Sequence, residues 1–409
     1  MRFSQYHFVD EIKNNLEKLG YKKPTDIQFK CIPNILKGED VLAIAQTGTG
    51  KTAAFVLPIL HILHAKNNSR RARGIQCVVM VPTRELAKQT WETFTKLGKN
   101  TRVDSFALYG GVEQLPQIEK LEDGLDVLIS TPGRLFDLVS QGYLQLHQVD
   151  ILVLDEADHM LAKGFIKDIR DLVRLLPKKR QTLFFSATID DEIKDLAYSL
   201  VVNPIRIQVS PKDPVSKNVD HYLMYVEMDD KRFFLERLVK EYEGKKILVF
   251  VRTQVRAERV VKAMERVSIH ALALHGGKEQ KERFEVLQKF KEGSCHLLIA
   301  TDVSSRGIDI QDVHVVLNYD IPDIVENYVH RVGRTGRGMS KGIAFSFCTE
   351  EEKDVLGKIV SYLGYQPKEM EIHNDNYQEV TLFSNEKKME LKDVLTEFPY
   401  LQKGKKKKS

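Results

Sequence analysis

Residues 41–63 read VLAIAQTGTGKTAAFVLPILHIL, and this stretch decides the fold of the first half of the chain. The five apolar residues 41–45 are typical of a buried strand, and the segment from Thr52 onward is typical of a helix. The residues between them contain the glycines and the lysine of a phosphate-binding loop. A strand, a phosphate loop and a helix in this order predict an α/β domain with a parallel sheet and a nucleotide site.

The loop suits a bound phosphate chain at most of its positions. Gly48 and Gly50 let the backbone approach closely, and the amides of the loop and of the helix start offer N–H donors. Lys51 can reach the β- and γ-phosphates, and the Thr52 hydroxyl can ligate Mg²⁺. Ala45 takes the place of the first glycine in the general pattern. The expected nucleotide contacts are Ala45, Gln46, Thr47, Gly48, Thr49, Gly50, Lys51 and Thr52.

An acidic segment, Asp155-Glu156-Ala157-Asp158, directly follows the apolar run 150–154. A carboxylate at the end of a parallel strand, beside a phosphate loop, is where a Mg²⁺-binding Asp belongs. Asp155 and Thr52 are therefore the candidate metal ligands. Glu156 is the candidate base, because hydrolysis needs a base within hydrogen-bond reach of the attacking water. Without the loop upstream, the cluster would indicate no more than a solvated turn.

Residues 330–337, HRVGRTGR, space arginines three apart with glycines between them. Glycine weakens a helix, and flexible backbone with several guanidinium groups suits anion capture. The second half of the chain has no phosphate loop after its first apolar run, 246–251. We therefore expect the arginines of this segment to act on the γ-phosphate, a role that can accelerate hydrolysis by ~10³ to 10⁵.

Apolar runs alternate with helix-like stretches along most of the chain, which indicates parallel sheets covered on both faces. The segment SPKDPVSK has two prolines and mixed charge, as expected of a linker. We predict an α/β fold with domains at 1–209 and 218–365, a linker at 210–217 and a C-terminal extension at 366–409. The predicted strands are 41–45, 76–81, 126–129, 150–154 and 182–185, then 246–251, 269–274, 296–300, 313–318 and 343–347.

The composition is that of a soluble globular protein, with 42% hydrophobic and 29% charged residues among 409. No apolar run could span a bilayer, and the N-terminus lacks a signal region, so we expect a cytoplasmic protein without a membrane partner. Four widely spaced cysteines predict reduced, buried thiols. The net charge of +5 equals the five lysines in the tail 403–408. The tail is equally consistent with a solubilising segment and with a non-specific phosphate-binding arm.

The phosphate loop, the DEAD sequence and HRVGRTGR together resemble the DEAD-box helicases of helicase superfamily 2, in a short bacterial-type form. The family's other blocks follow in the expected order: GYKKPTDIQ (20–28), PTRELA (82–87), GG (110–111), TPGR (131–134), SAT (186–188), VFVRT (249–253), HGGKEQKER (275–283) and TDVSSRGID (301–309). The resemblance covers nearly all of residues 1–365. It implies two tandem RecA-like domains, each a parallel β-sheet flanked by helices, and an RNA-stimulated ATPase that uses ATP and Mg²⁺.

The resemblance also implies roles for single residues. Gln28 would read adenine through its amide, and Phe3 and Tyr21 would stack near the base. Gly307 and Asp309 would complete the nucleotide site, with Asp309 at the ribose. Four residues would couple the ATP state to domain closure, namely Asp158, Ser186, Thr188 and His330. Catalysis would fall to Lys51, Asp155, Glu156, Arg334 and Arg337.

The implied partner is RNA, held mostly by its backbone and with little sequence specificity. The residues that would line the RNA groove are Pro82, Thr83, Arg84, Gly111, Thr131, Gly133, Arg134, Arg252, Gly276 and Thr301. We expect a monomeric ATP-dependent RNA helicase that unwinds or remodels RNA duplexes and RNA–protein complexes, in ribosome assembly or RNA turnover. An ATP-gated RNA clamp with little unwinding activity is the alternative, and a DNA translocase is disfavoured by the motifs.

Overall fold

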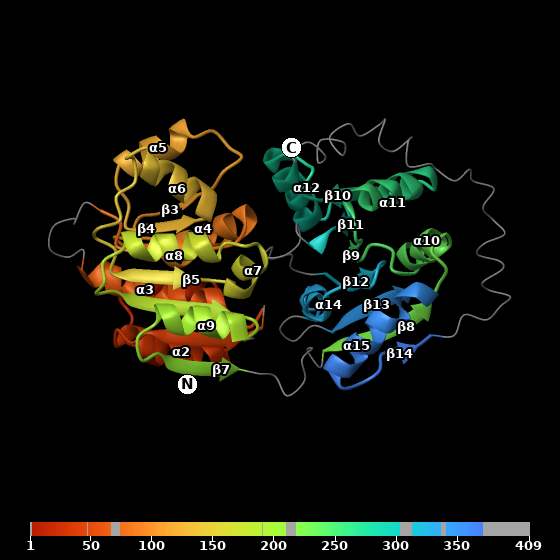
Figure 1. The fold of residues 1–409 in the computed structure, drawn as a ribbon, viewed down its shortest axis with the longest axis horizontal. Coiled ribbons are helices and arrows are strands. Elements are labelled where there is room, and N and C mark those ends of the chain that lie inside the picture. The colour runs from red at the N-terminus through yellow and green to blue at the C-terminus, as the bar shows by residue number, and fades with distance from the viewer. Residues whose placement is uncertain are drawn as a thin grey trace. The chain divides into compact units, whose positions relative to one another are not determined.

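A computed structural model of the chain describes residues 2–46, 48–66, 74–189, 191–209, 218–302, 313–336 and 341–370. The chain divides into a first unit, Met1–Ser210, and a second unit, Pro211–Ser409. Each unit contains one parallel sheet with helices on both faces (Figure 1). The predicted linker 210–217 and the lysine tail lie outside the described residues. No helix in the described part of the chain is long and apolar enough to cross a membrane.

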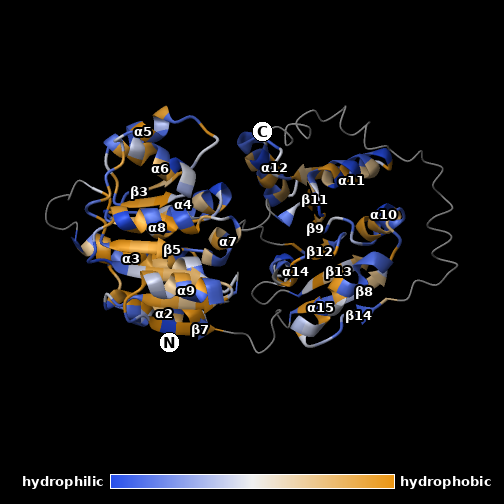
Figure 2. Ribbon diagram, viewed as in Figure 1, coloured by the Kyte–Doolittle hydropathy of each residue, from blue (hydrophilic) through white to orange (hydrophobic). Residues whose placement is uncertain are grey.

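The first unit is built on a seven-stranded sheet with the strand order β3-β4-β2-β5-β6-β1-β7. Its strands β1, β2, β4 and β5 are buried along their whole length, because helices cover both faces. The apolar character of β5 is visible in Figure 2, where its ribbon is orange. The strands are β1 (Val41–Ala45), β2 (Cys77–Met80), β3 (Ser105–Leu108), β4 (Val127–Ser130), β5 (Ile151–Leu154), β6 (Gln181–Ser186) and β7 (Ile205–Val209).

Alternate strand residues of the first unit enter two separate cores. Val41 and Ala43 join the core that contains α1 to α4, whereas Leu42 joins the core that contains α6 to α9. Each large apolar side chain buried in this way contributes about 1.5–3 kcal/mol. The helices are α1 (Asp10–Lys18), α2 (Asp26–Leu36), α3 (Lys51–Lys66), α4 (Arg84–Leu97), α5 (Leu115–Glu122), α6 (Pro132–Ser140), α7 (Ala157–Ala162), α8 (Ile166–Leu175) and α9 (Asp191–Leu200).

The second unit repeats this plan, since its strand order is β10-β11-β9-β12-β13-β8-β14. Taken from one edge to the other, β8 holds the place of β1, β9 that of β2, and β12 that of β5. The strands are β8 (Val219–Tyr225), β9 (Ile247–Phe250), β10 (Ala271–Leu274), β11 (Leu297–Ala300), β12 (Val315–Asn318), β13 (Gly342–Cys348) and β14 (Lys368–Glu369). β14 pairs with β8, so the sheet continues past residue 365, where the predicted second domain ends.

Helices of the second unit cover its sheet in three cores. α10 and α11 pack on one set of strand residues, α12 on another, and α14 and α15 on a third. These helices are α10 (Lys231–Glu241), α11 (Gln254–Arg266), α12 (Gln280–Glu292), α14 (Val325–Val332) and α15 (Lys353–Leu363). All four cysteines of the chain are buried and free, which confirms the prediction of reduced thiols.

Candidate active site

The predicted phosphate loop and acidic segment lie at the same edge of the first sheet. β1 and β5 both pair with β6, so the residues that follow them leave the sheet close together. Parallel strands end at one edge, where α/β proteins bind nucleotides. The fold therefore places the loop after β1 beside the carboxylates after β5.

The Lys51 side chain lies at the start of α3 and is buried. Its ammonium donates to the carbonyl oxygen of Ala45, the last residue of β1, at 2.7 Å. Within the loop, the Thr49 hydroxyl donates to Gln46 O at 2.7 Å. Gly48 and Gly50 have φ of 81° and 91°, which favours glycine at both positions. Thr52 is the next residue of α3 and is half-buried, whereas Thr47 lies outside the described residues.

Asp155 follows β5 and is 2% exposed. Burial is the main reason that the pKa of its carboxyl is raised to about 7. The carboxylates of Glu156 and Asp158 act in the same direction, whereas the Lys51 ammonium lowers this pKa. The influence of Lys51 shows that the loop and the acidic segment form one electrostatic site. A cation at this site would favour the ionised form of Asp155.

Glu156 adopts a left-handed backbone conformation, with φ 53° and ψ 50°, at the start of α7. A non-glycine residue there costs of order 1–3 kcal/mol, which the surrounding structure offsets. Its Oε2 lies 2.9 Å from Nδ1 of His159, and both side chains are buried. Sequence reasoning missed His159, although its place three residues after Glu156, on the same turn, was visible.

The residues predicted to hold adenine lie around α2. Gln28 Oε1 accepts from Thr25 N at 2.9 Å, and Nε2 donates to Gly50 O at 3.1 Å. The Gln28 amide thus ties the start of α2 to the phosphate loop. The ring of Phe3 is buried and lies 6.0 Å, edge-on, from the half-exposed ring of Tyr21. The predicted adenine contacts of these residues stay predictions.

The residues predicted to couple ATP to closure lie in both units. Thr188 Oγ1 is 3.5 Å from Asp158 Oδ2, at the outer limit of a hydrogen bond. Within the described residues, Asp158 Oδ1 and Ser186 Oγ are buried and have no hydrogen-bond partner. Such orphaned buried groups are rare and mark places that can accept a further partner. His330 lies in α14 of the second unit.

The HRVGRTGR segment is only partly as predicted. Its first residues are helical, because α14 continues to Val332 and only then ends at Gly333. Arg331 is engaged internally: Nε and Nη2 donate to the Asp302 carboxylate at 2.6 and 2.7 Å. Arg334 follows the helix, and its Nε donates to His330 O at 3.2 Å. The predicted site residues Arg337, Gly307 and Asp309 lie outside the described residues.

The predicted RNA residues of the first unit gather at the ends of β2, β3 and β4. Thr83 caps α4 by accepting from Leu86 N at 3.2 Å, next to Pro82. The Arg84 guanidinium lies against Gly111, where a Cβ would overlap it. Arg134 Nη2 donates to Val112 O at 3.1 Å. The remaining two residues, Thr131 and Gly133, lie at the start of α6, directly after β4.

The second unit places its predicted RNA residues at the equivalent strand ends. Arg252 follows β9, Gly276 follows β10 and Thr301 follows β11. Arg252 differs from expectation, because its Nη2 already lies 3.1 Å from Glu352 Oε1 and 3.4 Å from Asp323 Oδ1. Its guanidinium is therefore held by protein carboxylates as well as half-exposed to solvent.

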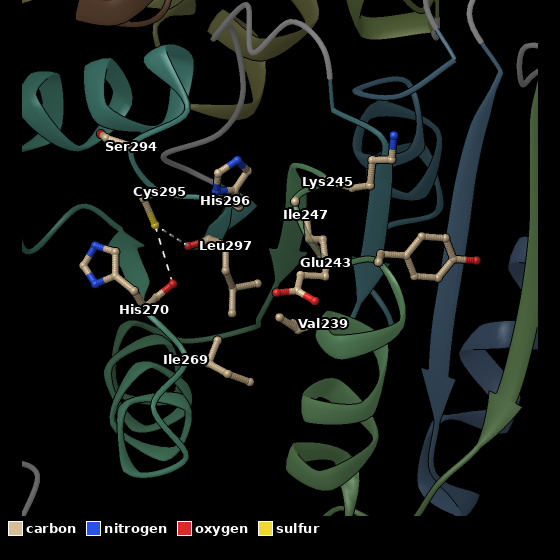
Figure 3. A pocket seen from close by; sticks show the side chains of 12 residues that line it. Val239, Glu243, Lys245, Ile247, Ile269, His270, Ser294, Cys295, His296 and Leu297 are labelled. Atoms are coloured by element: carbon tan, nitrogen blue, oxygen red, sulfur yellow. Dashed lines mark hydrogen bonds between the residues drawn. The ribbon is translucent and has the colours of Figure 1, made fainter.

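A pocket of about 210 Å³ lies at the opposite edge of the second sheet, where β9 and β11 begin (Figure 3). Its lining includes Glu243, His270, His296 and Cys295, whose thiol lies 3.3 Å from Leu297 O. Burial raises the pKa of the Cys295 thiol, so it is a poor nucleophile. None of the predicted site residues lines this pocket.

Comparisons with known proteins agree with the resemblance. The DEAD/DEAH box helicase model matches residues 25–196, and the helicase conserved C-terminal domain model matches residues 230–339. DEAD-box ATP-dependent RNA helicase CshA of Bacillus cereus is 40% identical over 359 residues, which cover 87% of this chain and 67% of that protein. DEAD-box ATP-dependent RNA helicase 40 of Oryza sativa is 39% identical over 360 residues, 87% of this chain but 45% of the relative. The chain thus spans 32% to 67% of the length of such plant and Bacillus relatives.

Comparison with solved structures also finds DEAD-box proteins that match nearly the whole chain. S. cerevisiae Dbp5 bound to RNA and ADP BeF3 is 29% identical, with a TM-score of 0.81, and the match covers 96% of this chain and 99% of that one. A DEAD box protein from Methanococcus jannaschii is 35% identical, with a TM-score of 0.53, over 91% of this chain and 99% of that one. The chain belongs to the DEAD-box helicase family, and its fold of two tandem RecA-like domains is confirmed.

Replacement of Asp155 by Asn should change how stability depends on pH. The folded-state pKa of about 7 lies above the ordinary aspartate pKa of about 4, so the folded protein keeps a proton that the unfolded chain releases between these values. This contribution to stability is fully present below about pH 4 and is lost as the pH rises through about 7. Asp155→Asn cannot titrate, so its stability relative to wild type should rise by roughly 2–3 kcal/mol between pH 5 and 8.

Chemical unfolding of both proteins in a chelating buffer at the two pH values measures this difference. The chelator keeps divalent cations from holding the carboxylate in its charged form. A stability difference that stays constant between pH 5 and 8 would show that the Asp155 carboxyl titrates normally.

Proposed function

We propose that the chain is an ATP-dependent RNA helicase, which couples ATP binding and hydrolysis to local opening of RNA duplexes. The observation that carries this proposal is the juxtaposition of Lys51 with Asp155 and Glu156 at one strand edge, in a member of the DEAD-box family. The named relatives are ATP-dependent RNA helicases, and a solved relative is bound to RNA and ADP BeF3, which supports both ligands. RNA and ATP together would favour a closed arrangement of the two units.

The chain's own donors fit a magnesium ion at the nucleotide. Thr52 offers a hydroxyl and Asp155 a carboxylate, the hard oxygen ligands that Mg²⁺ prefers. Burial is the main cause that raises the pKa of the Asp155 carboxyl, and the neighbouring carboxylates of Glu156 and Asp158 add to it, so a bound cation would favour the ionised form of Asp155. When bound, the ion would neutralise charge on the phosphate oxygens.

Hydrolysis would proceed by in-line attack of water on the γ-phosphorus. The water oxygen forms a bond to phosphorus, the bond to the β–γ bridging oxygen breaks, and ADP and phosphate are the products. The Glu156 carboxylate accepts the water proton. With its proton on Nδ1, His159 donates to Glu156 Oε2 and thereby fixes the orientation of the Glu156 carboxylate. Lys51 and Arg334 would stabilise the charge that develops on the phosphoryl oxygens.

RNA would be bound at the ends of β2, β3 and β4 and at the equivalent ends of β9, β10 and β11. Arg84, Arg134 and Arg252 are cations at these ends, and the Arg134 Nη1 has no hydrogen-bond partner among the described residues. Guanidinium groups, amides and hydroxyls at strand ends recognise phosphate and sugar, not base identity. This composition supports binding to RNA of many sequences.

Glu156→Gln should bind ATP and RNA normally but hydrolyse ATP at least ~100-fold more slowly, because the amide cannot accept the water proton. Steady-state phosphate release and filter binding with a non-hydrolysable ATP analogue measure the two effects. Glu122→Gln, at an exposed glutamate at the end of α5, is the matched control and should retain full activity. Wild-type turnover by Glu156→Gln would remove Glu156 from its role as base.

A strand-displacement assay on the wild-type protein distinguishes a helicase from an ATP-gated clamp. A helicase should separate a short RNA duplex at a rate that depends on ATP. Retention of RNA in the presence of ATP, without strand separation under the same conditions, would favour the clamp. A DNA oligomer that stimulates the ATPase as well as an RNA oligomer would contradict the assignment to RNA.

Gly111→Ala should weaken RNA binding several-fold, because the new Cβ would displace the Arg84 guanidinium. It should also destabilise the protein by about 1–2 kcal/mol, since φ at this position is 78°. Gly124→Ala is the matched control, because φ there is 85° and nothing lies within 4 Å of the added Cβ. The control should show a similar stability loss with unchanged RNA affinity by fluorescence anisotropy. Equal RNA affinity in both variants would exclude Arg84 from the RNA surface.

A further inference from the structure

The second unit has a lysine at the position that Lys51 holds in the first. β1 and β8 occupy the same place in the two sheets. Lys51 is six residues after Ala45, the last residue of β1, and Lys231 is six residues after Tyr225, the last residue of β8. Each lysine is the first residue of the helix that follows, α3 or α10.

A carboxylate shows the same correspondence. β5 and β12 occupy the same place in the two sheets. Glu156 is two residues after Leu154, the end of β5, and Asp320 is two residues after Asn318, the end of β12. The second unit therefore keeps a lysine and a carboxylate where the first unit has its phosphate-binding lysine and its predicted base.

The surroundings of the two lysines differ. Lys231 has no exposed surface, and its ammonium lies 2.7 Å from Tyr319 O, 2.9 Å from Glu352 Oε2 and 3.3 Å from Phe347 O. These three acceptors match the three N–H donors of an ammonium group. Lys51, in contrast, has one hydrogen-bond acceptor, Ala45 O, among the residues that the structure describes. Lys51 can receive a phosphate, and Lys231 is already neutralised by the protein.

The loop before Lys231 is also unsuited to phosphate. Residues 226–230 read VEMDD, without glycine and with three acidic side chains. Val226 is buried in the core beside α10. The second unit therefore has acidic side chains where the first unit has the glycines of its phosphate loop.

The same carboxylates hold the strand ends of the second unit together. Glu352 Oε1 accepts from Arg252 Nη2 at 3.1 Å and from Ile321 N at 3.2 Å. Asp320, which has no exposed surface, accepts from Arg252 N at 2.8 Å and from the Arg256 guanidinium. The segments after β9, β12 and β13 are thus joined through Lys231, Asp320 and Glu352.

The cluster also reaches α14. Arg331, in this helix, donates through Nη1 to Asp320 O at 2.7 Å and to Asn318 Oδ1 at 3.2 Å. α14 leads directly to Arg334. The place of Arg252 and the start of the arginine segment therefore both depend on the backbone around Asp320.

We propose that Lys231, Asp320 and Glu352 are positioning residues. In the second unit, their charged groups fill the place that corresponds to the site of the nucleotide phosphates in the first unit. They thereby hold Arg252 in position to bind RNA, and they hold α14 so that the arginine segment that follows it can act on the triphosphate. This role rests on the proposed RNA-stimulated ATPase. It also makes the second unit unable to bind a nucleotide at its own strand edge, since no donor of Lys231 is left for a phosphate.

The test compares RNA-stimulated ATP hydrolysis by the full chain with two variants, Lys231→Met and Glu352→Gln. Lys231→Met removes the central cation. Glu352→Gln keeps the shape but presents an amide NH₂ to either Lys231 or Arg252, both of which are donors. The RNA-stimulated kcat should fall about tenfold in Lys231→Met and several-fold in Glu352→Gln, as expected when reacting groups are misplaced. The RNA concentration for half-maximal stimulation should rise in both.

Binding of a fluorescent ADP analogue separates this role from general damage to the protein. Its affinity should stay within twofold of wild type, because Lys51 and its loop belong to the first unit. Leu238→Ala is the matched control, since Leu238 is an apolar core residue on α10 that lies seven residues beyond Lys231. It should lower the melting temperature yet retain kcat at a temperature where the protein is folded. Should Lys231→Met not fold, Glu352→Gln decides the question.

Wild-type kcat and wild-type RNA half-saturation in the folded variants would overturn the positioning role. So would an equal loss of kcat in Leu238→Ala, because the effect would then follow stability alone. If the wild-type protein shows no stimulation by RNA, the proposed function itself is wrong, and that result is distinct from unchanged variants of a stimulated enzyme.

Discussion

The site depends on the electrostatic attraction between the Lys51 ammonium and the carboxyl group of Asp155 at one edge of the first sheet. Burial alone would leave Asp155 protonated, and the Lys51 ammonium opposes this effect. Strand order makes the contact possible, because β6 lies between β1 and β5 and brings their ends together. The site therefore has carboxylates on one side, which suit a metal ion, and the Lys51 ammonium on the other, which suits a phosphate. A metal–nucleotide complex requires both.

Different strand ends of the first sheet carry different predicted roles. The ends of β1, β5 and β6 carry the predicted chemistry, whereas the ends of β2, β3 and β4 carry the predicted RNA contacts. In the second unit the predicted RNA contacts lie at the equivalent ends of β9, β10 and β11, and the internal charges around Lys231 occupy the remaining part. A duplicated architecture can therefore hold one nucleotide, because only one copy keeps an open lysine and flexible glycines.

The sequence predicted the elements whose signals are local. The strand at 41–45 and the helix expected from Thr52 onward agree with β1 and α3, since the apolar run and the glycine loop that follows it are both local signals. β3 and β7 were missed, because their outer positions in the sheet leave residues half-buried or exposed and remove the apolar run. The buried Lys231 was not predicted either, because its partner Glu352 is 121 residues away. The helix through Arg331 was missed because the glycines of HRVGRTGR suggested flexible backbone, whereas they follow the helix.

Calorimetric titration of the full chain with ADP tests the central claim, that the chain holds one nucleotide and holds it through Lys51. We expect one ADP per chain, a loss of affinity of at least ~100-fold in Lys51→Met, and no loss in the control Lys37→Met, where the lysine is exposed. Two ADP molecules per chain, or one that binds Lys51→Met as tightly as wild type, would contradict the account.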